Sequence, residues 1–306
     1  MARTRFAPDR GLTYRMLSTM FLIGLLYVVF VGVLLVVLRG AWPLVVVIAG
    51  GLFIAQFWFS DKIAMFGMGA HEVTAEEYPQ LHGAVDRLCA LADMPKPRVA
   101  VADSDVPNAF ATGRNQKNAV VCATTGLLRR LEPEELEGVL AHELSHVAHK
   151  DVAVMTIAGF LGVLAGFLTR IGLQLGLFGG FGDNRDDEGD DTGPTLLVVI
   201  AVSAVVYAIS FLLTRILSRY RELAADRSAA LLTGRPSALA SALTKVTGPI
   251  SAIPTRDLRQ AQPFNAFYFA PALASRQSVS NLLSTHPTLE RRLEQLGQIS
   301  IELGRH

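Results

Sequence analysis

Long apolar runs dominate the first two thirds of the chain and predict helices that cross a membrane. A spanning helix needs about 20 predominantly apolar residues. Four runs meet or approach this length. Only Arg39 and Gly40 separate the first two, so we expect these two to form a tight helical hairpin. The predicted spans are residues 17–38, 41–59, 152–169 and 195–214.

The first and third runs each have an alternative interpretation. A secretory signal peptide has an apolar core of about 7–15 residues, which is shorter than the uncharged run at 17–38, so we expect a retained anchor. Arg170 interrupts the third run before a Gly-rich tail that reaches Phe181, and this run also fits a buried core helix followed by a loop. The fourth run is uncharged and matches the thickness of a bilayer.

Positively charged residues predict the side of the membrane on which each polar segment lies. Arginines cluster before the first span and directly after the fourth, whereas the segment between the third and fourth spans contains DNRDDEGDD. Lys and Arg near the ends of spans favour the cytoplasmic side. We therefore expect a multi-pass protein of a bacterial-type plasma membrane. Both termini and the segment 60–151 should be cytoplasmic, with the acidic tract outside.

Composition supports a membrane protein and excludes some classes of function. Of the 306 residues, 51% are hydrophobic and 18% are charged, against about 25% charged in soluble domains. The net charge of +1 gives no basic surplus, so we do not expect nucleic acid as a partner. Cys89 and Cys122 lack CxxC spacing, and we expect two reduced cysteines packed as small hydrophobic side chains.

The polar segment before span three predicts helices and a small β element. A helix is predicted at 75–91, capped by Thr74, and another at 133–149, which Pro133 opens in its first turn. Short β-rich runs at 98–101 and 119–123 flank PNAFATGRNQKN, whose Asn and Gly residues suit a turn.

The polar segment after span four completes the same domain. Helices are predicted at 219–232, 237–247 and 288–303, whereas 248–275 has no assignment. The expected organisation is an N-terminal segment and hairpin at 1–60, a first catalytic part at 61–151, spans three and four at 152–217, and a second catalytic part at 218–306.

The segment His142-Glu143-Leu144-Ser145-His146 carries the main chemical signal. Positions i and i+4 of a helix share one face, with Cβ atoms about 5–6 Å apart, so both imidazoles can bind one metal ion. Glu143 is then placed to act on a metal-bound water molecule. Zinc suits this set, because it takes nitrogen and oxygen ligands in tetrahedral geometry. His149 lies three residues further on, and we expect a structural role for it.

A third protein ligand should come from a distant helix. Glu222 is the best candidate, and Asp226 lies one turn later on the same face of the segment RYRELAADRSAALL. A carboxylate there could bind the metal or orient a ligand histidine, and spacing alone leaves both assignments open. Spans three and four return the chain to the same side of the membrane, so this helix can meet the one that carries His142 and His146.

With these residues in place, the chain resembles the HtpX family of integral-membrane metallopeptidases. That family is related to the CAAX prenyl proteases and to mitochondrial membrane-quality-control peptidases. The resemblance rests on HELSH, RELAAD and STHPTLERR, and it covers nearly the whole chain, including the four-span layout and PNAFATG. It implies that Glu222 binds zinc, with Asp226 in support. It also implies an edge strand for the substrate backbone, formed by Asn108, Ala109, Phe110 and Ala111.

Two further residues have two interpretations each. His286 precedes Pro287 at a loop-to-helix junction, and Arg292 lies two turns later. They fit a capped surface helix with a solvated arginine. They also fit a site in which His286 stabilises the oxyanion while Arg292 orients an acid, and the resemblance favours this second interpretation.

The expected protein is a mainly α membrane protein with a small β element, built from four transmembrane helices and a zincin-like catalytic domain. The expected function is a zinc-dependent endopeptidase, with one Zn²⁺ per chain and Glu143 as the base. It should cleave cytoplasmic segments of misfolded membrane proteins or other unfolded polypeptides. One alternative is a CAAX-type processing peptidase, which four spans disfavour. Another is a non-catalytic membrane scaffold or sensor, which an intact Glu143 disfavours.

Overall fold

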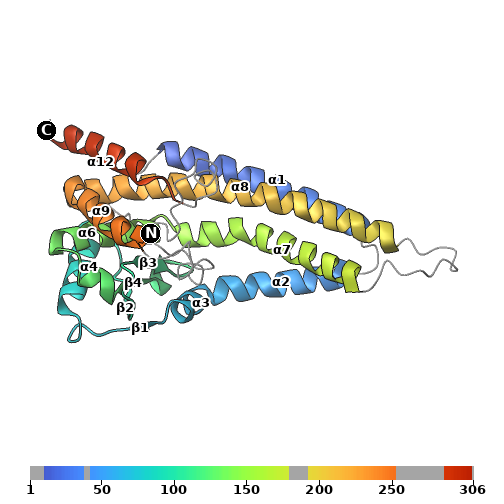
Figure 1. The fold of residues 1–306 in the computed structure, drawn as a ribbon, viewed down its shortest axis with the longest axis horizontal. Coiled ribbons are helices and arrows are strands. Elements are labelled where there is room, and N and C mark those ends of the chain that lie inside the picture. Colours follow the sequence, from blue (N-terminus) through green and yellow to red (C-terminus); the bar gives the residue numbers. More distant parts are fainter. Residues whose placement is uncertain (1–9, 38–41, 179–191, 253–285, 305–306) are drawn as a thin grey trace. The chain divides into compact units, whose positions relative to one another are not determined.

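The computed structural model describes residues 10–37, 42–178, 192–252 and 286–304 (Figure 1). The chain divides into two compact units, which are described separately. The helical unit contains Tyr14–Phe57 and Met155–Leu217. The mixed unit contains Met1–Thr13, Trp58–Val154 and Ser218–His306. The segment 253–285, which includes most of the unassigned stretch 248–275, and the acidic tract 183–191 lie outside the described residues.

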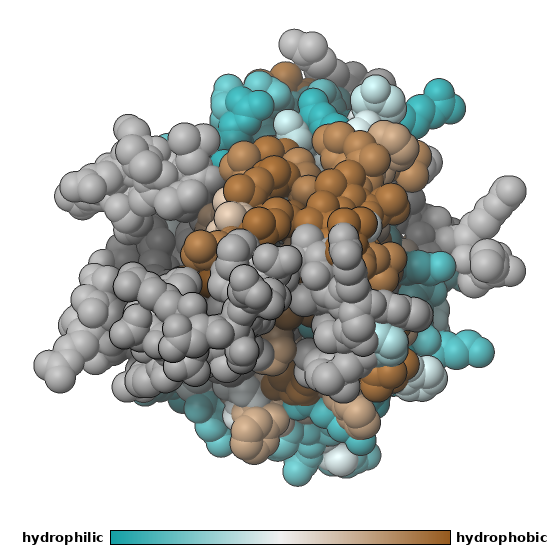
Figure 2. Space-filling model, turned by 90° about the vertical axis from the view of Figure 1, so that its right-hand side faces the viewer, coloured by the Kyte–Doolittle hydropathy of each residue, from teal (hydrophilic) through white to brown (hydrophobic). Residues whose placement is uncertain are grey.

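Four long helices supply the helical unit: α1 (Arg10–Val37), α2 (Trp42–Trp58), α7 (Asp151–Phe178) and α8 (Thr192–Thr233). By length and composition, two of the described stretches could cross a membrane, Thr13–Val36 and Leu197–Thr233. The apolar stretches Ala49–Trp58 and Ile157–Arg170 are shorter. Large apolar side chains such as Phe21 and Val28 are exposed, and hydrophobic residues gather over the middle of the face drawn in Figure 2.

Two of these helices run past the predicted ends of their spans. Arg170 lies within α7, which continues to Phe178, because arginine is a good helix former and does not break a helix. Helix α8 continues without interruption from the fourth predicted span to Thr233. The separate helix predicted at 219–232 is therefore part of α8, since residues 215–233 contain no Gly or Pro to end it.

The mixed unit contains a four-stranded sheet with the order β1-β2-β4-β3. The strands are β1 (Ala70–Glu72), β2 (Arg98–Ala102), β3 (Ala109–Thr112) and β4 (Val120–Thr124). Strands β2 and β4, which correspond to the two predicted β runs, pair in parallel with Arg98 opposite Val120. They can be parallel because the intervening segment forms more than a turn. It supplies β3, which pairs antiparallel with β4 and lies at one edge of the sheet.

Alternate residues of the strands pack on opposite faces of the sheet, as the period of two in a strand requires. Val99, Val101 and Val121 join the large core with helices α4 (Pro79–Ala92) and α6 (Pro133–Ala148). Ala100, Ala102 and Cys122 pack on the other face with Ala64 of helix α3 (Ser60–Gly67). Both cysteines are free and buried, as predicted, and burial raises the pKa of Cys122 to about 12.

The helix predicted at 75–91 begins later, at Pro79. Thr74 and Glu77 instead close a separate turn, in which the Thr74 N–H donates to Glu77 Oε2 at 2.7 Å. Pro79 accounts for the break, because the residue before a proline is displaced from helical backbone angles, and Tyr78 has φ −131° and ψ 66°.

Helix α6 begins and ends as its sequence predicts. Pro133 is in its first turn, and the side chains of Glu132 and Glu135 form a capping box. After His149, Lys150 has φ 59°, and the chain turns there into α7. Glu135 also contacts Lys245, which lies on helix α9, at 2.8 Å. The remaining helical elements are α5 (Thr125–Leu128), η1 (Gln116–Asn118), α9 (Pro236–Ala252) and α12 (Leu289–Leu303).

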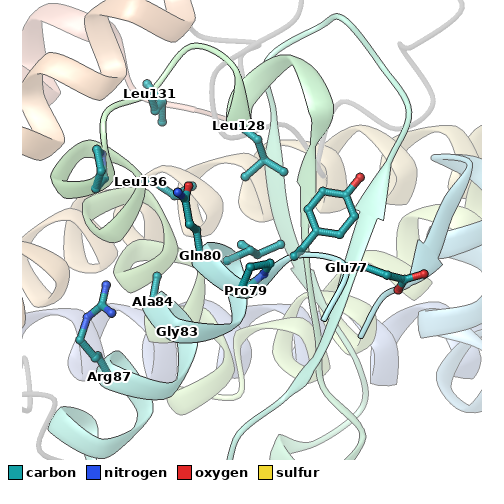
Figure 3. Close-up of a pocket in the computed structure, with 12 residues that line it drawn as sticks. Glu77, Pro79, Gln80, Gly83, Ala84, Arg87, Leu128, Leu131 and Leu136 are labelled. Carbon is teal, nitrogen blue, oxygen red and sulfur yellow. The ribbon is translucent and has the colours of Figure 1, made fainter. Parts of the chain in front are cut away.

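A groove of about 490 Å³ opens between the start of α4 and the turn that joins α5 to α6 (Figure 3). Tyr78, Pro79, Leu128 and Leu131 contribute to its largely apolar lining. None of the residues predicted to carry chemistry lines this groove. The groove is therefore separate from the candidate site.

Candidate metal centre

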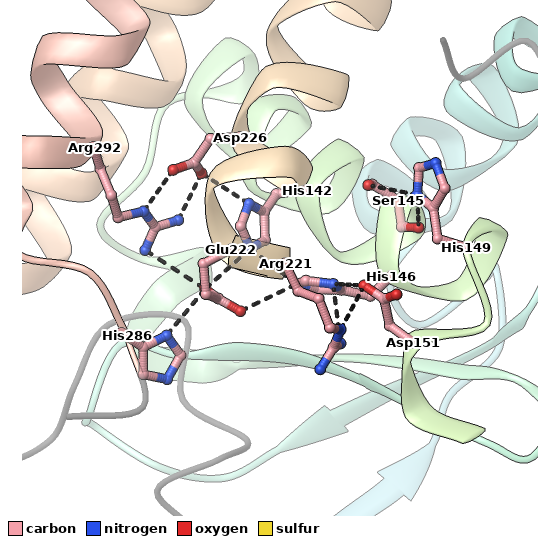
Figure 4. Close-up of polar contacts among 10 residues, drawn as sticks. All are labelled: His142, Ser145, His146, His149, Asp151, Arg221, Glu222, Asp226, His286 and Arg292. Carbon is pink, nitrogen blue, oxygen red and sulfur yellow. Dashed lines mark hydrogen bonds and ion pairs between the residues drawn. The ribbon is translucent and has the colours of Figure 1, made fainter. Parts of the chain in front are cut away.

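Helix α6 brings the two histidines of the predicted motif together. The Nε2 atoms of His142 and His146 lie 3.2 Å apart, and the two rings meet edge to face (Figure 4). Both side chains are buried. Glu143, which follows His142 on the same helix, is buried as well. Burial therefore holds all three groups in a site with little access to bulk water.

Glu222 of α8 completes a set of three donor groups. Its Oε1 atom lies 3.4 Å from His146 Nε2, and its Oε2 atom lies 3.6 Å from His142 Nε2. With bonds of about 2.0–2.1 Å in tetrahedral geometry, the donor atoms of a zinc site lie about 3.3 Å apart. The observed separations of 3.2–3.6 Å fit an ion held between these three side chains. Among the described residues, His142, His146 and Glu222 form the cluster of side chains that could hold a metal ion.

Carboxylates behind the two histidines fix which ring nitrogen faces the centre. His142 Nδ1 lies 2.9 Å from Asp226 Oδ1, and His146 Nδ1 lies 2.7 Å from Asp151 Oδ2. An ionised carboxylate accepts a hydrogen bond from the nitrogen that it contacts, so both Nδ1 atoms carry hydrogen and both Nε2 atoms can present lone pairs to a metal. Asp226 thus lies behind a histidine, whereas Glu222 lies with the donor atoms, a distinction that spacing had left open.

Each of these carboxylates is paired with a buried arginine. Arg292 of α12 contacts both oxygens of Asp226 at 2.7 Å. Arg221 Nε lies 3.0 Å from Asp151 Oδ2. A buried ionised group is expensive to leave unpaired, so each arginine helps to keep its carboxylate ionised and in place. The result is two parallel chains of contacts, from histidine to aspartate to arginine.

The residues His286 and Arg292 also meet at this centre. His286 Nδ1 lies 3.0 Å from Glu222 Oε2, and Arg292 Nη1 lies 3.9 Å from the same oxygen. Both side chains are buried. The interpretation of Arg292 as a solvated surface residue is therefore wrong. Thr288 does cap α12, accepting a hydrogen bond from the Arg291 N–H, so the capped helix of that interpretation is present.

Buried charges shift the ionisation of the metal-free site. Burial lowers the pKa of His146, but Asp151 and Glu222 outweigh it and raise that pKa to about 10. Burial likewise opposes the charged form of His142, whose pKa Asp226 and Glu222 raise. A metal ion would replace these protons, because its ligands must be deprotonated. Burial also raises the pKa of Glu143, which suits a group that must accept and later release a proton.

Two residues of the centre, Asp151 and Arg221, were missed from the sequence. Asp151 follows His146 by five residues and comes directly after the turn at Lys150, so its contact depends on the angle between α6 and α7. The available signal was an acid close behind the histidine motif. His149, for which we expected a structural role, contacts the Ser145 carbonyl oxygen through Nδ1 at 2.8 Å.

The predicted substrate strand is present next to α6. Asn108 precedes β3, and its N–H donates to Thr124 Oγ1 at 2.9 Å. Asn108, Ala109 and Phe110 are buried, and Ala111 is half-buried. Helix α6 packs against β3, so an edge strand lies beside the helix that carries the histidines.

Comparisons with known proteins agree with this geometry. Residues 75–300 match the model of peptidase family M48. The chain is 65% identical over 302 residues to "Protease HtpX homolog 1" of Streptomyces coelicolor, covering 99% of this chain and 97% of that protein. It is 50% identical over 304 residues to "Protease HtpX homolog" of Moorella thermoacetica, covering 98% of each.

A solved structure shares the fold. The crystal structure of Ste24p from S. mikatae has a TM-score of 0.52 and 18% sequence identity, and the match covers 93% of this chain and 65% of that one. At this identity the likeness concerns the fold alone, whereas the family follows from the sequence matches. The chain belongs to peptidase family M48, among the HtpX proteases, and it is a membrane metalloprotease.

Proposed function

We propose that this metalloprotease is a zinc endopeptidase that cleaves cytoplasmic segments of misfolded membrane proteins and other unfolded polypeptides. One zinc ion per chain would be held by His142, His146 and Glu222. The observation that carries this proposal is the convergence of three metal-binding side chains at separations of 3.2–3.6 Å, with a buried Glu143 next to His142. This arrangement supports hydrolysis over the alternative of a non-catalytic scaffold.

Glu143 and His286 would perform the acid–base and electrostatic work. When bound, zinc supplies a water molecule of lowered pKa and polarises the peptide carbonyl. Glu143 would accept a proton from a water molecule in the site and deliver it to the leaving amine nitrogen. These two steps require a group that can hold the proton between them. His286, whose Nδ1 atom contacts Glu222 Oε2, would donate a hydrogen bond to the developing oxyanion. Asp226 and Asp151 would keep the histidines oriented.

The edge strand β3 supports a broad choice of substrates. An extended peptide can add to a sheet edge through main-chain hydrogen bonds, which depend little on the peptide's sequence. Asn108, Ala109, Phe110 and Ala111 would form that edge beside α6. An unfolded polypeptide can present such an extended segment, whereas a folded domain cannot. This argument favours unfolded chains over folded domains as the substrate.

The membrane layout is part of the proposal. We infer four spans, in which helices α2 and α7 cross the bilayer at the predicted ranges 41–59 and 152–169, in addition to the two longer stretches. The arginines before span one and after span four would then face the cytoplasm, as would the metal centre. This orientation would give the enzyme access to cytoplasmic segments of its substrates.

The first prediction concerns the base. Glu143→Gln retains shape but cannot accept a proton, so casein cleavage by the detergent-purified protein should fall by at least ~10²-fold. Zinc content should stay near wild type, because no ligand is lost. Glu134→Gln, at an exposed position of the same helix, is the matched control and should leave cleavage unchanged. Cleavage by Glu143→Gln at the wild-type rate would contradict the mechanism.

The second prediction separates the two acids of α8. Glu222→Ala should abolish zinc retention after dialysis, because it removes a ligand. Asp226→Ala should weaken zinc affinity by about 10–100-fold, the usual cost of losing the partner of a ligand histidine. Glu294→Ala, an exposed acid of α12, is the control. Elemental analysis decides the outcome, and the assignment is reversed if Asp226→Ala strips the metal while Glu222→Ala retains it.

The third prediction tests orientation in a background with Cys89 and Cys122 replaced. A cysteine at Asn184, in the acidic tract, should react with an impermeant thiol reagent added to intact cells. A cysteine at Lys117, in the mixed unit, should react only after permeabilisation. Labelling of Lys117→Cys from outside would contradict a cytoplasmic active site. If Asn184→Cys reacts only after permeabilisation, spans three and four would instead form a hairpin that does not cross the bilayer.

A further inference from the structure

Helix α3 has one face buried on the sheet and an opposite face that is unusually apolar. On the inner face, Ala64 is fully buried against β2 and β4. On the outer face, Phe59, Ile63 and Phe66 follow the i, i+4, i+7 spacing of one helix face. All three are exposed, and Phe66 is 91% exposed. The sheet therefore accounts for only one side of this helix.

The outer face continues into a neighbouring aromatic residue and carries positive charge at its rim. Trp58, which ends α2, is 54% exposed. The Arg114 guanidinium lies 4.7 Å from the centre of the Trp58 ring, and Lys62 Nζ lies 5.7 Å from that of Phe59. Scattered apolar side chains on a surface need no explanation, but a contiguous group indicates a binding surface. Aromatic rings beside Lys and Arg are typical of the membrane–water interface.

We propose that this surface, formed by Trp58, Phe59, Ile63 and Phe66, is an anchor that lies at the boundary between phospholipid headgroups and acyl chains. The chain itself indicates a lipid occupant. Helix α2 contains no charged residue from Trp42 to Trp58 and leads directly into α3. The inference rests on the proposed second span but not on the zinc site. Lys62 and Arg114 would then face the lipid phosphates.

Ion pairs fix this anchor to the sheet. Asp61, on the inner side of α3, is buried and lies 2.8 Å from Arg98 Nη2 of β2. Arg98 Nη1 also contacts Glu72 of β1 at 2.6 Å. Arg114 follows β3 by two residues, and its Nη1 donates to the Trp58 carbonyl oxygen at 3.4 Å. Lipid binding at α3 would therefore hold the sheet, with its edge strand β3, in a fixed orientation at the bilayer surface.

Spin-label accessibility in phospholipid vesicles tests the anchor without depending on activity. Labels are placed singly at Phe66→Cys and, as a control, at Ile301→Cys, an exposed apolar position of α12, with Cys89 and Cys122 replaced. The label at 66 should be relaxed more by oxygen than by a water-soluble nickel chelate, and the label at 301 should show the reverse. Equal nickel accessibility at both positions would overturn the proposal. Spin–spin coupling between labels at position 66 would overturn it as well, because it would show that a second copy of the chain, and not lipid, covers this surface.

A second variant tests the consequence for substrates. Ile63→Ser combined with Phe66→Ser removes only exposed apolar groups, so folding, zinc content and cleavage of soluble casein should remain at wild type. Cleavage of the same polypeptide tethered to vesicle lipid should fall by about tenfold or more, as expected from losing the burial of a large apolar side chain. Tethered cleavage at the wild-type rate would overturn the positioning role. Absence of casein cleavage in the wild type would count against the proposed function instead.

Discussion

The pairing of buried charges around two histidines is the constraint on which the rest of the site depends. His142 and His146 each contact an aspartate, and each aspartate contacts a buried arginine. Removing one partner of such a buried pair typically costs about 3–5 kcal/mol, because it leaves a charge uncompensated. Segments far apart in the sequence must therefore come together: α6, the start of α7, the end of α8, and α12. The position of Glu222 between the two histidines follows from this assembly.

This constraint also links fold to function. The contacts that stabilise the buried charges also direct both Nε2 atoms toward Glu222. The same contacts therefore orient the metal ligands. The sheet contributes a different element, an edge strand packed beside α6. In our proposal, α3 binds lipid and thereby holds this sheet at the bilayer surface. Hydrolysis, substrate binding and membrane position would thus be carried by different parts of one unit.

Local patterns in the sequence predicted the parts of the structure that depend on local interactions. Helix α6 was predicted because Pro133 and the apolar spacing determine its start and its buried face. Spacing along the sequence could not decide between Glu222 and Asp226, which share a face of α8, because the difference between them lies in the contact of Asp226 with Arg292 of another helix. Asp151 and Arg221 were missed for the same reason. The continuity of α8 was missed because the change from apolar to charged residues was interpreted as an end, although no residue there breaks a helix.

Metal analysis of the wild-type protein tests the central claim most directly. The detergent-purified protein should contain one zinc ion per chain. A chelator should remove both the metal and casein cleavage, and one equivalent of zinc per chain should restore cleavage. Full cleavage by protein shown to be metal-free would contradict the account, as would a protein that folds with its charge pairs intact and binds no zinc.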